Sequence, residues 1–535
     1  MRTQKEDLGE LTRRDFLYLS GLGMAGMALT GVPESSQAAE KKPKYGGRLR
    51  IAERSGPPSL DAHKYQIFDG FQAYVLMYNA LAIMGPLPQV NIYPDIAKSW
   101  DISPDGREYI FPLKEGVKFH DGKEMDSGDV KYSFDRVMNP ATRAPKAFSY
   151  RWIDSVSIMD KYHVKIRLKE PFGPFLSTLT VQNCPIIPAN SQPTPTKPAP
   201  GTGPFVFESF VPNETYELTR FDKYWEVDEK TGNRLPYLDR IYVKKIVDEN
   251  VRWVALRAGD MDYIQVPPPK IAIQELKTPT PGILMVLPQP VGCTWIFFNC
   301  SKPPFNDKRV RQAIAYTIDK EQIIKGAFWG LAEISNNQPF LSRSRMYIPV
   351  EDRKIDIEKA KKLMAEAGYP EGFKTEFFER PYLNYTDSAQ IAMGQLKKLG
   401  IESTMKTLDR AAWTLEMRKG NYSISMAGDS ERMDPDDAYY MRLHSSEIGM
   451  NNWSRYSNKK LDELLEKGRK IWKWEDRVPV YREIVEFIKE EVPILYIDKP
   501  INAVAIRDYV KGHSFGAATW FGYAGGGIKN VWLDK

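Results

Sequence analysis

The second half of the sequence, after about residue 294, alternates between two hydrophobic patterns. A continuous apolar run at residues 295–299 predicts a strand that is buried on both faces. Helical and strand-like patterns then follow one another. The predicted strands are 374–379, 401–408 and 422–427, and the predicted helices begin near 307 and cover 357–367, 387–399 and 411–419. Because strands and helices alternate, this region is predicted to form an α/β sheet with helical crossovers.

The first half of the sequence has a different pattern, with short strands separated by turns. Strands are predicted at residues 45–51, 108–113, 117–119 and 240–247, and helices near 71–81, 127–137 and 251–258. Asp-Gly pairs between them predict tight turns, since Gly accepts positive φ. Seven prolines between Pro185 and Pro204 fit either an interdomain linker or a long internal loop.

Length and charge limit the class of protein. At 535 residues the chain is too long for one compact core, so at least two lobes are expected. An apolar content of 42% indicates a packed globular protein. The net charge of +6 is spread over 75 basic and 69 acidic residues, with no basic stripe. We therefore expect no nucleic-acid partner.

The three cysteines do not form a disulfide framework. If residues 294–299 are a strand, Cys293 and Cys300 lie roughly 23 Å apart at about 3.3 Å per residue, beyond disulfide reach. A bridge that involves Cys184 stays possible.

The N-terminus has the features of an export signal. Arg13 and Arg14 form a twin-arginine motif, residues 16–32 are apolar and Gly-rich, and small residues at 36–38 predict cleavage after Ala38. An uncleaved membrane anchor is the alternative, which the glycines and the processing site disfavour. No cysteine precedes Cys184, so the mature protein is expected to be periplasmic and not lipidated.

Four motifs follow one another between residues 94 and 134. They are Pro-Asp-Ile-Ala-Lys-Ser-Trp at 94–100, Ser-Pro-Asp-Gly at 103–106, Gly-Val-Lys-Phe-His-Asp-Gly at 116–122 and Asp-Val-Lys-Tyr-Ser-Phe at 129–134. Their order and spacing resemble the signature region of the family 5 extracytoplasmic solute-binding proteins, the peptide- and nickel-binding receptors of ABC importers. The Gly-Thr-Gly-Pro-Phe at 201–205 is similar to a segment of that family's first lobe, which favours the internal loop.

The resemblance implies a fold and a function. The fold is an α/β, two-lobed periplasmic binding protein of type II, in the large peptide-receptor subclass, with hinged lobes around a central cleft. Lobe I would comprise residues 39–293 and 498–535, and lobe II residues 294–497. Such a receptor captures a di- or oligopeptide and delivers it to a membrane permease driven by an ATPase. We expect a monomer without enzymatic activity or cofactor.

Two charged residues follow strands of the predicted α/β sheet, where open sheets of this kind bind ligands. Arg380 and Tyr382 resemble the segment that holds the peptide carboxylate in dipeptide-binding proteins, and Asp429 resembles the group that holds the amino terminus. An arginine can bind a carboxylate through two hydrogen bonds. The alternative is a turn or surface role for both charges. The segment departs from the family pattern at Met426, where relatives have Trp, and by two extra residues before Asp434.

Other candidates are weaker. The aromatic residues Tyr65, Trp295 and Trp413 could stack on a ligand, although core packing is at least as consistent with the sequence. His444 has no metal-ligand spacing around it, so no metal site is expected. Residues 457–460 match Ser-x-x-Lys of penicillin-binding enzymes, but they also fit a helix N-cap. A non-peptide solute, such as an opine, an oligosaccharide or a metal chelate, and a secreted hydrolase remain as alternative functions.

Overall fold

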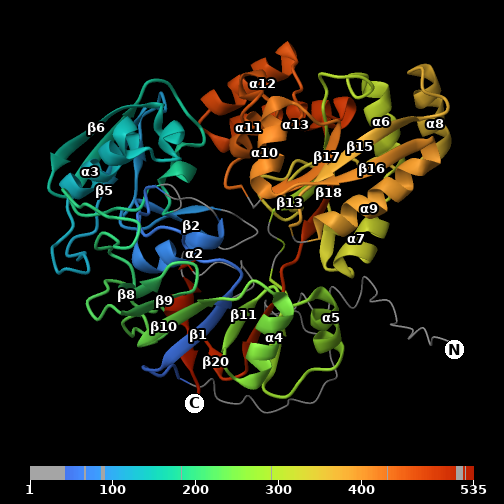
Figure 1. Ribbon diagram of the computed structural model, residues 1–535. Coiled ribbons are helices and arrows are strands. Elements are labelled where there is room, and N and C mark those ends of the chain that lie inside the picture. Colours follow the sequence, from blue (N-terminus) through green and yellow to red (C-terminus); the bar gives the residue numbers. More distant parts are fainter. Residues whose placement is uncertain are drawn as a thin grey trace, which may run out of the picture. The chain divides into compact units, whose positions relative to one another are not determined.

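Figure 1 shows the computed structural model of the protein. Residues 44–535 form one compact unit, separate from residues 1–43. The export signal predicted at residues 1–38 lies outside the described residues. The structure describes residues 42–535, except 65–67, 86–90, 182–183, 289, 291, 383, 430–431, 514–521 and 524–525.

A seven-stranded sheet contains strands from the first part and from the last part of this unit's sequence. Its strands, in spatial order, are β12 (Ile283–Val286), β19 (Val504–Arg507), β11 (Tyr263–Gln265), β1 (Arg48–Glu53), β10 (Arg240–Lys245), β9 (Thr215–Arg220) and β8 (Phe205–Val211). The central strand β1 runs parallel to β10 and β11, whereas β19 is antiparallel to its neighbours. Strand β19, in the last part of the chain, therefore returns to the sheet that contains β1. The associated helices are α4 (Glu249–Ala258) and α5 (Pro269–Lys277).

A four-stranded antiparallel sheet has its own core. Its order is β4 (Asp101–Ile102), β5 (Glu108–Pro112), β7 (His163–Leu168) and β6 (Ile153–Asp160), and α3 (Ser127–Met138) packs on it through Val130 and Phe134. The prediction of a strand at residues 117–119 is wrong. The chain there makes a single bridge, Lys118 with Glu124, because it turns back on itself at Gly122.

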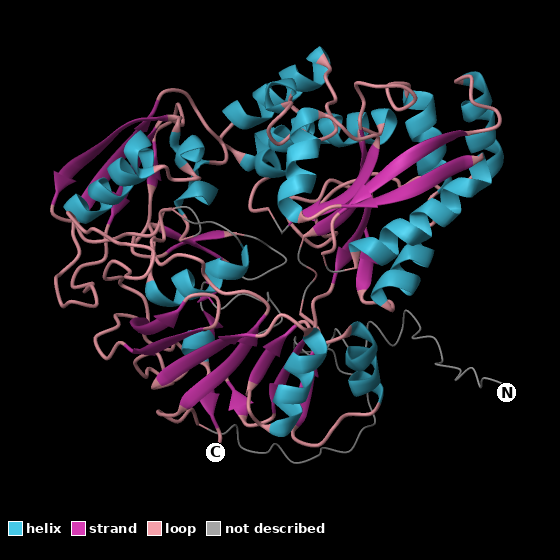
Figure 2. Ribbon diagram, in the orientation of Figure 1, coloured by secondary structure: helices cyan, strands magenta, loops and turns pink. Residues whose placement is uncertain are grey.

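The predicted α/β region forms a six-stranded sheet. Its order is β14 (Ala332–Ile334), β18 (Ile494–Pro500), β13 (Cys293–Phe298), β17 (Ile424–Asp429), β15 (Phe373–Glu379) and β16 (Ile401–Thr407). Strand β15 is parallel to β16 and β17, with α9 (Tyr385–Leu396) and α10 (Arg410–Lys419) as the crossovers. The predicted alternation is confirmed (Figure 2).

Helices cover both faces of this sheet, which explains the continuous apolar run in β13. Ile296 and Phe298 pack in one core cluster, with residues of α6 (Lys308–Thr317) and α9, whereas Trp295 and Phe297 pack in another, with Trp413 of α10. Helix α12 (Lys459–Lys470) begins after Asn458, whose side chain accepts hydrogen bonds from the amides of Lys460 and Leu461, so the N-cap interpretation of residues 457–460 is confirmed. The other helices of this region are α7 (Lys320–Phe328), α8 (Ile357–Glu366), α11 (Pro435–Leu443) and α13 (Trp474–Glu491).

The signature motif at residues 116–122 is hydrogen-bonded to the loop at residues 201–203. The amide of His120 donates to the carbonyl of Gly201 (2.8 Å), and its Nε2 lies 3.0 Å from the carbonyl oxygen of Gly203. The amide of Gly203 donates to the carbonyl of Met77, where helix α2 ends, four residues before the predicted end at residue 81. The remaining helix and short strands are α2 (Phe68–Met77), β2 (Ala82–Met84), β3 (Ile92–Pro94), β20 (Val510–Lys511), β21 (Gly522–Tyr523), β22 (Gly526–Gly527) and β23 (Trp532–Leu533).

Candidate functional site

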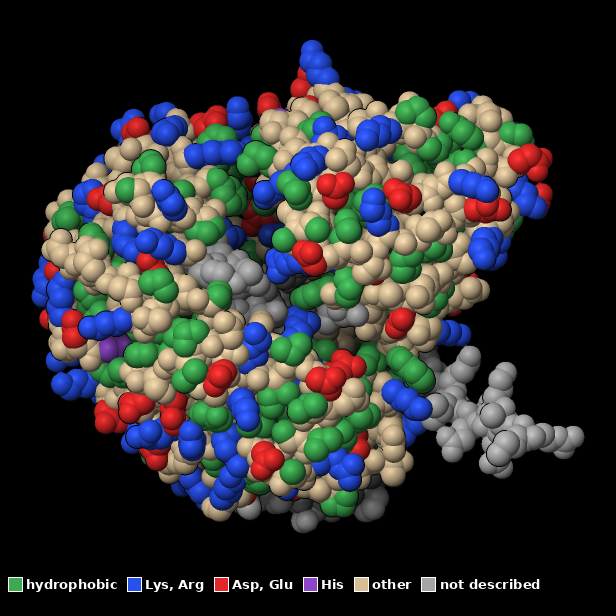
Figure 3. All heavy atoms as spheres, viewed as in Figure 1, with side chains coloured by type: hydrophobic (Ala, Val, Ile, Leu, Met, Phe, Trp, Pro, Cys, Tyr) green, Lys and Arg blue, Asp and Glu red, His purple; other side chains and the backbone are tan. Residues whose placement is uncertain are grey.

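The two charged residues singled out from the sequence lie at one edge of the six-stranded sheet. Arg380 directly follows β15, and Asp429 is the last residue of β17. Because β15 and β17 are neighbouring parallel strands, their carboxyl ends meet at the same edge. The visible surface is hollowed between the four-stranded-sheet region and helices α11 and α12 (Figure 3).

Arg380 lies among aromatic rings. Its guanidinium carbon is 4.9 Å from the ring centroid of Tyr382, 5.7 Å from that of Tyr385 and 5.3 Å from that of Trp413. Within the described part of the chain it makes no hydrogen bond or ion pair, and its Nε is buried without an acceptor. Burial lowers the pKa of Arg380 from its ordinary value, although the group stays charged near neutral pH. A partly buried guanidinium of this kind is suited to binding an anionic oxygen.

Tyr382 connects the two large sheets. Its hydroxyl accepts a 2.8 Å hydrogen bond from Nη2 of Arg54, the residue that follows β1, and the Arg54 guanidinium lies 4.7 Å from its ring centroid. The aromatic ring that supports Arg380 is thus fixed by the seven-stranded sheet.

Asp429 is enclosed by two arginines. Nη2 of Arg432 lies 2.5 Å from Oδ1, and Arg442 donates to Oδ2 from Nε (2.9 Å) and Nη2 (2.6 Å). The Asp429 side chain is 17% exposed. Burial opposes its ionisation, but the two arginines outweigh this effect and lower its pKa. These arginines were not predicted from the sequence. The longer segment before Asp434 contained a signal, because it places Arg432 three residues after the acid.

A second pair of charges lies within electrostatic range of Asp429. Lys146 belongs to the segment between α3 and β6, and Asp437 to α11. Burial lowers the pKa of Lys146, whereas the negative charges of Asp437 and Asp429 act to raise it. Burial also raises the pKa of Asp437 to about 6, whereas the positive charges of Lys146 and Arg432 act to lower it. Groups from the four-stranded-sheet region and from the six-stranded-sheet region therefore influence each other's charge.

Comparison with known proteins identifies the family. The model for the bacterial extracellular solute-binding proteins, family 5, matches residues 91–451. The chain belongs to this family. Members are extracytoplasmic binding proteins of ABC importers, not enzymes, and they work with permease and ATPase components.

Individual members of the family are similar over most of their length. The heme-binding protein A of Haemophilus influenzae is 28% identical over 468 residues, covering 81% of this chain and 84% of that protein. The dipeptide-binding protein of Escherichia coli is 27% identical over 475 residues, covering 82% and 86%. The structure of DppA from Helicobacter pylori in complex with the peptide STSA is 27% identical, with a TM-score of 0.78 over 92% of this chain and 99% of that one. These matches show the two-lobed α/β fold of periplasmic binding proteins.

In this solute-binding protein the other candidate residues are mainly buried. Trp295 is 3% exposed, packs edge-to-face with Tyr496 and lies beneath Arg442. Trp413 is buried, and its Nε1 donates to the hydroxyl of Ser425 (3.1 Å), which fixes the ring beside Arg380. Met426 has no exposed surface and packs in the core with Ile296, so we assign it a packing role. Tyr65 lies outside the described residues.

His444 lies in the junction between α11 and α12. Its ring stacks on Tyr440, and its Nδ1 is 2.7 Å from the hydroxyl of Ser446. Among the described residues there is no cluster of three or more potential metal ligands, no helix long and apolar enough to cross a membrane and no disulfide.

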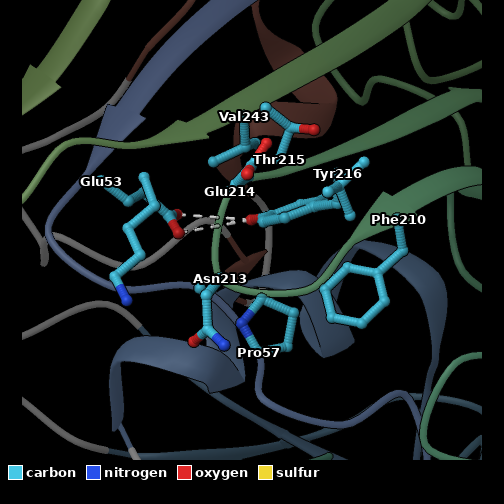
Figure 4. Close-up of a pocket in the computed structure, with 11 residues that line it drawn as sticks. Glu53, Pro57, Phe210, Asn213, Glu214, Thr215, Tyr216 and Val243 are labelled. Atoms are coloured by element: carbon cyan, nitrogen blue, oxygen red, sulfur yellow. Dashed lines mark hydrogen bonds between the residues drawn. The ribbon is translucent and has the colours of Figure 1, made fainter.

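A separate pocket lies beside the seven-stranded sheet (Figure 4). It is lined by Glu53, Pro57, Phe210, Asn213 and Tyr216, and the Tyr216 hydroxyl donates to the Glu53 carboxylate at 3.4 Å. Its cavity volume of about 10 Å³ has room for about one water molecule and is far below the roughly 300–1,000 Å³ of small-molecule sites. This pocket is therefore not our candidate ligand site.

Proposed function

We propose that this protein is the periplasmic substrate-binding component of an ABC importer that captures di- or oligopeptides by lobe closure. The ligand enters between the lobes, the lobes close around it, and the closed form delivers it to the permease. Closure is stabilised only to the extent that the ligand binds the closed form more tightly than the open one. No chemical step is required of the protein.

The observation that carries the proposal is the free guanidinium of Arg380. It lies at a strand end, supported by the rings of Tyr382 and Trp413, and its buried Nε has no hydrogen-bond acceptor among the described residues. A peptide carboxylate would supply the missing acceptor and the opposite charge. Family membership and the similarity to dipeptide-binding proteins support a peptide as the source of this group.

The proposal includes the organisation of the chain. Residues 39–293 and 498–535 form lobe I, and residues 294–497 form lobe II. Residues 1–38 direct export by the twin-arginine pathway and are removed, so the mature protein is periplasmic, not lipidated and monomeric. These assignments rest on the sequence motifs.

Thermal-shift measurements with a peptide panel test the proposal. A peptide at 100 times its dissociation constant adds about 2.7 kcal/mol of stability. For a peptide that binds, Arg380→Ala should reduce affinity by roughly thirty- to several-thousand-fold, or about 2–5 kcal/mol. Arg418→Ala is the matched control, because Arg418 is exposed on the neighbouring helix α10. If Arg380→Ala binds the peptide as tightly as the control does, Arg380 does not hold the carboxylate.

The alternative ligands are distinguishable. Opines, oligosaccharides and metal chelates belong in the same panel, and native mass spectrometry of protein purified without refolding reports the mass of a co-purified ligand. A secreted hydrolase would cleave the peptides, whereas a receptor returns them intact.

A further inference from the structure

Asp429 was expected to hold a ligand's amino terminus, which requires a free carboxylate. In the structure both of its oxygens are engaged, Oδ1 by Arg432 and Oδ2 by Arg442. A carboxylate between two guanidinium groups has little attraction left for an ammonium group, because the nearest net charge that the ligand meets is positive. Because of the two arginines, this sheet edge attracts an anionic group and not an ammonium group.

Among the described residues, two buried N–H groups at this edge have no acceptor. Each of the three nitrogens of Arg442 has an acceptor, since Nε and Nη2 donate to Asp429 and Nη1 donates to the carbonyl of Asn451 (3.2 Å). Nη2 of Arg432 lies against Asp429, and the Nε of Arg432 is buried without an acceptor, as is that of Arg380. Buried N–H groups are nearly always paired in native proteins, so two such groups at one sheet edge indicate missing acceptors.

The balance of charges at this sheet edge also favours an anionic ligand. Among the described residues, the electrostatically linked set contains four basic groups and two acidic ones, an excess of two positive charges. They are Arg380, Arg432, Arg442 and Lys146 against Asp429 and Asp437. Exposed Arg410, which also interacts with Arg380, adds to the excess.

The neighbouring acids do not change this balance. Asp434 and Asp436 are neutralised by bidentate ion pairs with Arg477 and Arg469.

We propose that the ligand is an anionic carboxylate compound, with one acid group on Arg380 and a second on Arg432, and that it needs no free amino group. This inference rests on the proposed receptor function and specifies its ligand class. A peptide with an acidic side chain meets the requirement whether or not its amino terminus is free, and a dipeptide with two neutral side chains, which has a single carboxylate, does not.

The test compares matched ligands on the full mature protein. Glu-Ala, N-acetyl-Glu-Ala and Glu-Ala amide differ only at their ends, and glutarate carries two carboxylates without a peptide bond. We expect N-acetylation to leave affinity unchanged or to raise it about tenfold, and amidation to lower it. A loss of about tenfold or more on N-acetylation would overturn the inference and leave the peptide receptor standing.

The other outcomes separate the two proposals. Binding of glutarate without any peptide supports the anionic site and contradicts the peptide receptor. No response to any anionic member, or a neutral or cationic co-purified compound, overturns the inference.

A substitution isolates Arg432. In Arg432→Gln, Arg442 still neutralises Asp429, so the protein is expected to fold. Affinity for the anionic ligand should fall about tenfold or more, whereas Arg418→Gln, an exposed change on α10, should have no effect. If Arg432→Gln instead strengthens binding of the peptide with a free amino terminus and weakens binding of its acetylated form, then Asp429 binds the amino group and the inference is wrong.

Discussion

Nη2 of Arg54 donates a 2.8 Å hydrogen bond to the hydroxyl of Tyr382. The two residues follow β1 and β15, which belong to different sheets, so this bond spans the proposed lobes beside Arg380. Tyr382→Phe removes the hydroxyl and keeps the ring. Losing the bond should weaken ligand binding by about 0.5–1.5 kcal/mol, or roughly two- to tenfold, because the closed form is less favoured.

Calorimetry with the ligand identified by the panel measures this effect. Tyr369→Phe is the matched control, since Tyr369 packs edge-to-face with Phe373 and makes no hydrogen bond through its hydroxyl in the described part of the chain. Equal affinities for the two variants would show that the Arg54–Tyr382 bond does not contribute to closure.

Gly203 is expected to be essential for stability. A Cβ atom there would lie 2.5 Å from the carbonyl carbon of Met77 and 2.6 Å from the amide nitrogen of Tyr78, both of them backbone atoms. Gly203→Ala must therefore displace the loop from the end of α2, at a cost of about 1–3 kcal/mol. Urea denaturation measures the loss. Gly56→Ala serves as the control, because no atom lies within 4 Å of its Cβ position, and a loss of equal size there would contradict the steric explanation.

Asp498 should make stability depend on pH. It is fully buried in β18, where burial raises its pKa to about 7 against the effect of the 2.6 Å hydrogen bond from Thr294. The folded protein therefore holds this proton more tightly than the unfolded chain does. As the pH rises from about 4 to about 7, stability should fall by up to about 1.4 kcal/mol per pH unit from this group.

Asp498→Asn removes this contribution. Denaturation curves at several pH values should show a flatter slope between pH 4 and 7, and a relative gain in stability at pH 8. Asp260→Asn changes an exposed carboxyl and should keep the wild-type slope. Identical pH profiles for the wild type and Asp498→Asn would contradict this assignment.

The sequence predicted local structure well where one periodicity dominated. The alternation after residue 294 and the buried strand at 295–299 agree with the six-stranded sheet, since apolar spacing reports how much of each element is covered. It failed at 117–119, where buried apolar residues lie in an irregular turn, and at the end of α2, which the Gly201–Gly203 loop determines. Buried residues and strand residues have similar composition, so their sequence patterns overlap.

The sequence by itself determined the family and the positions of Arg380 and Asp429 at strand ends. Both follow from motifs and periodicity, which are local properties of the chain. Only the tertiary structure decided which groups surround them: Arg442 thirteen residues beyond Asp429, and Arg54 more than three hundred residues before Tyr382. The partner that a buried charge receives depends on how distant elements pack, and that partner decides whether the charge remains available to a ligand.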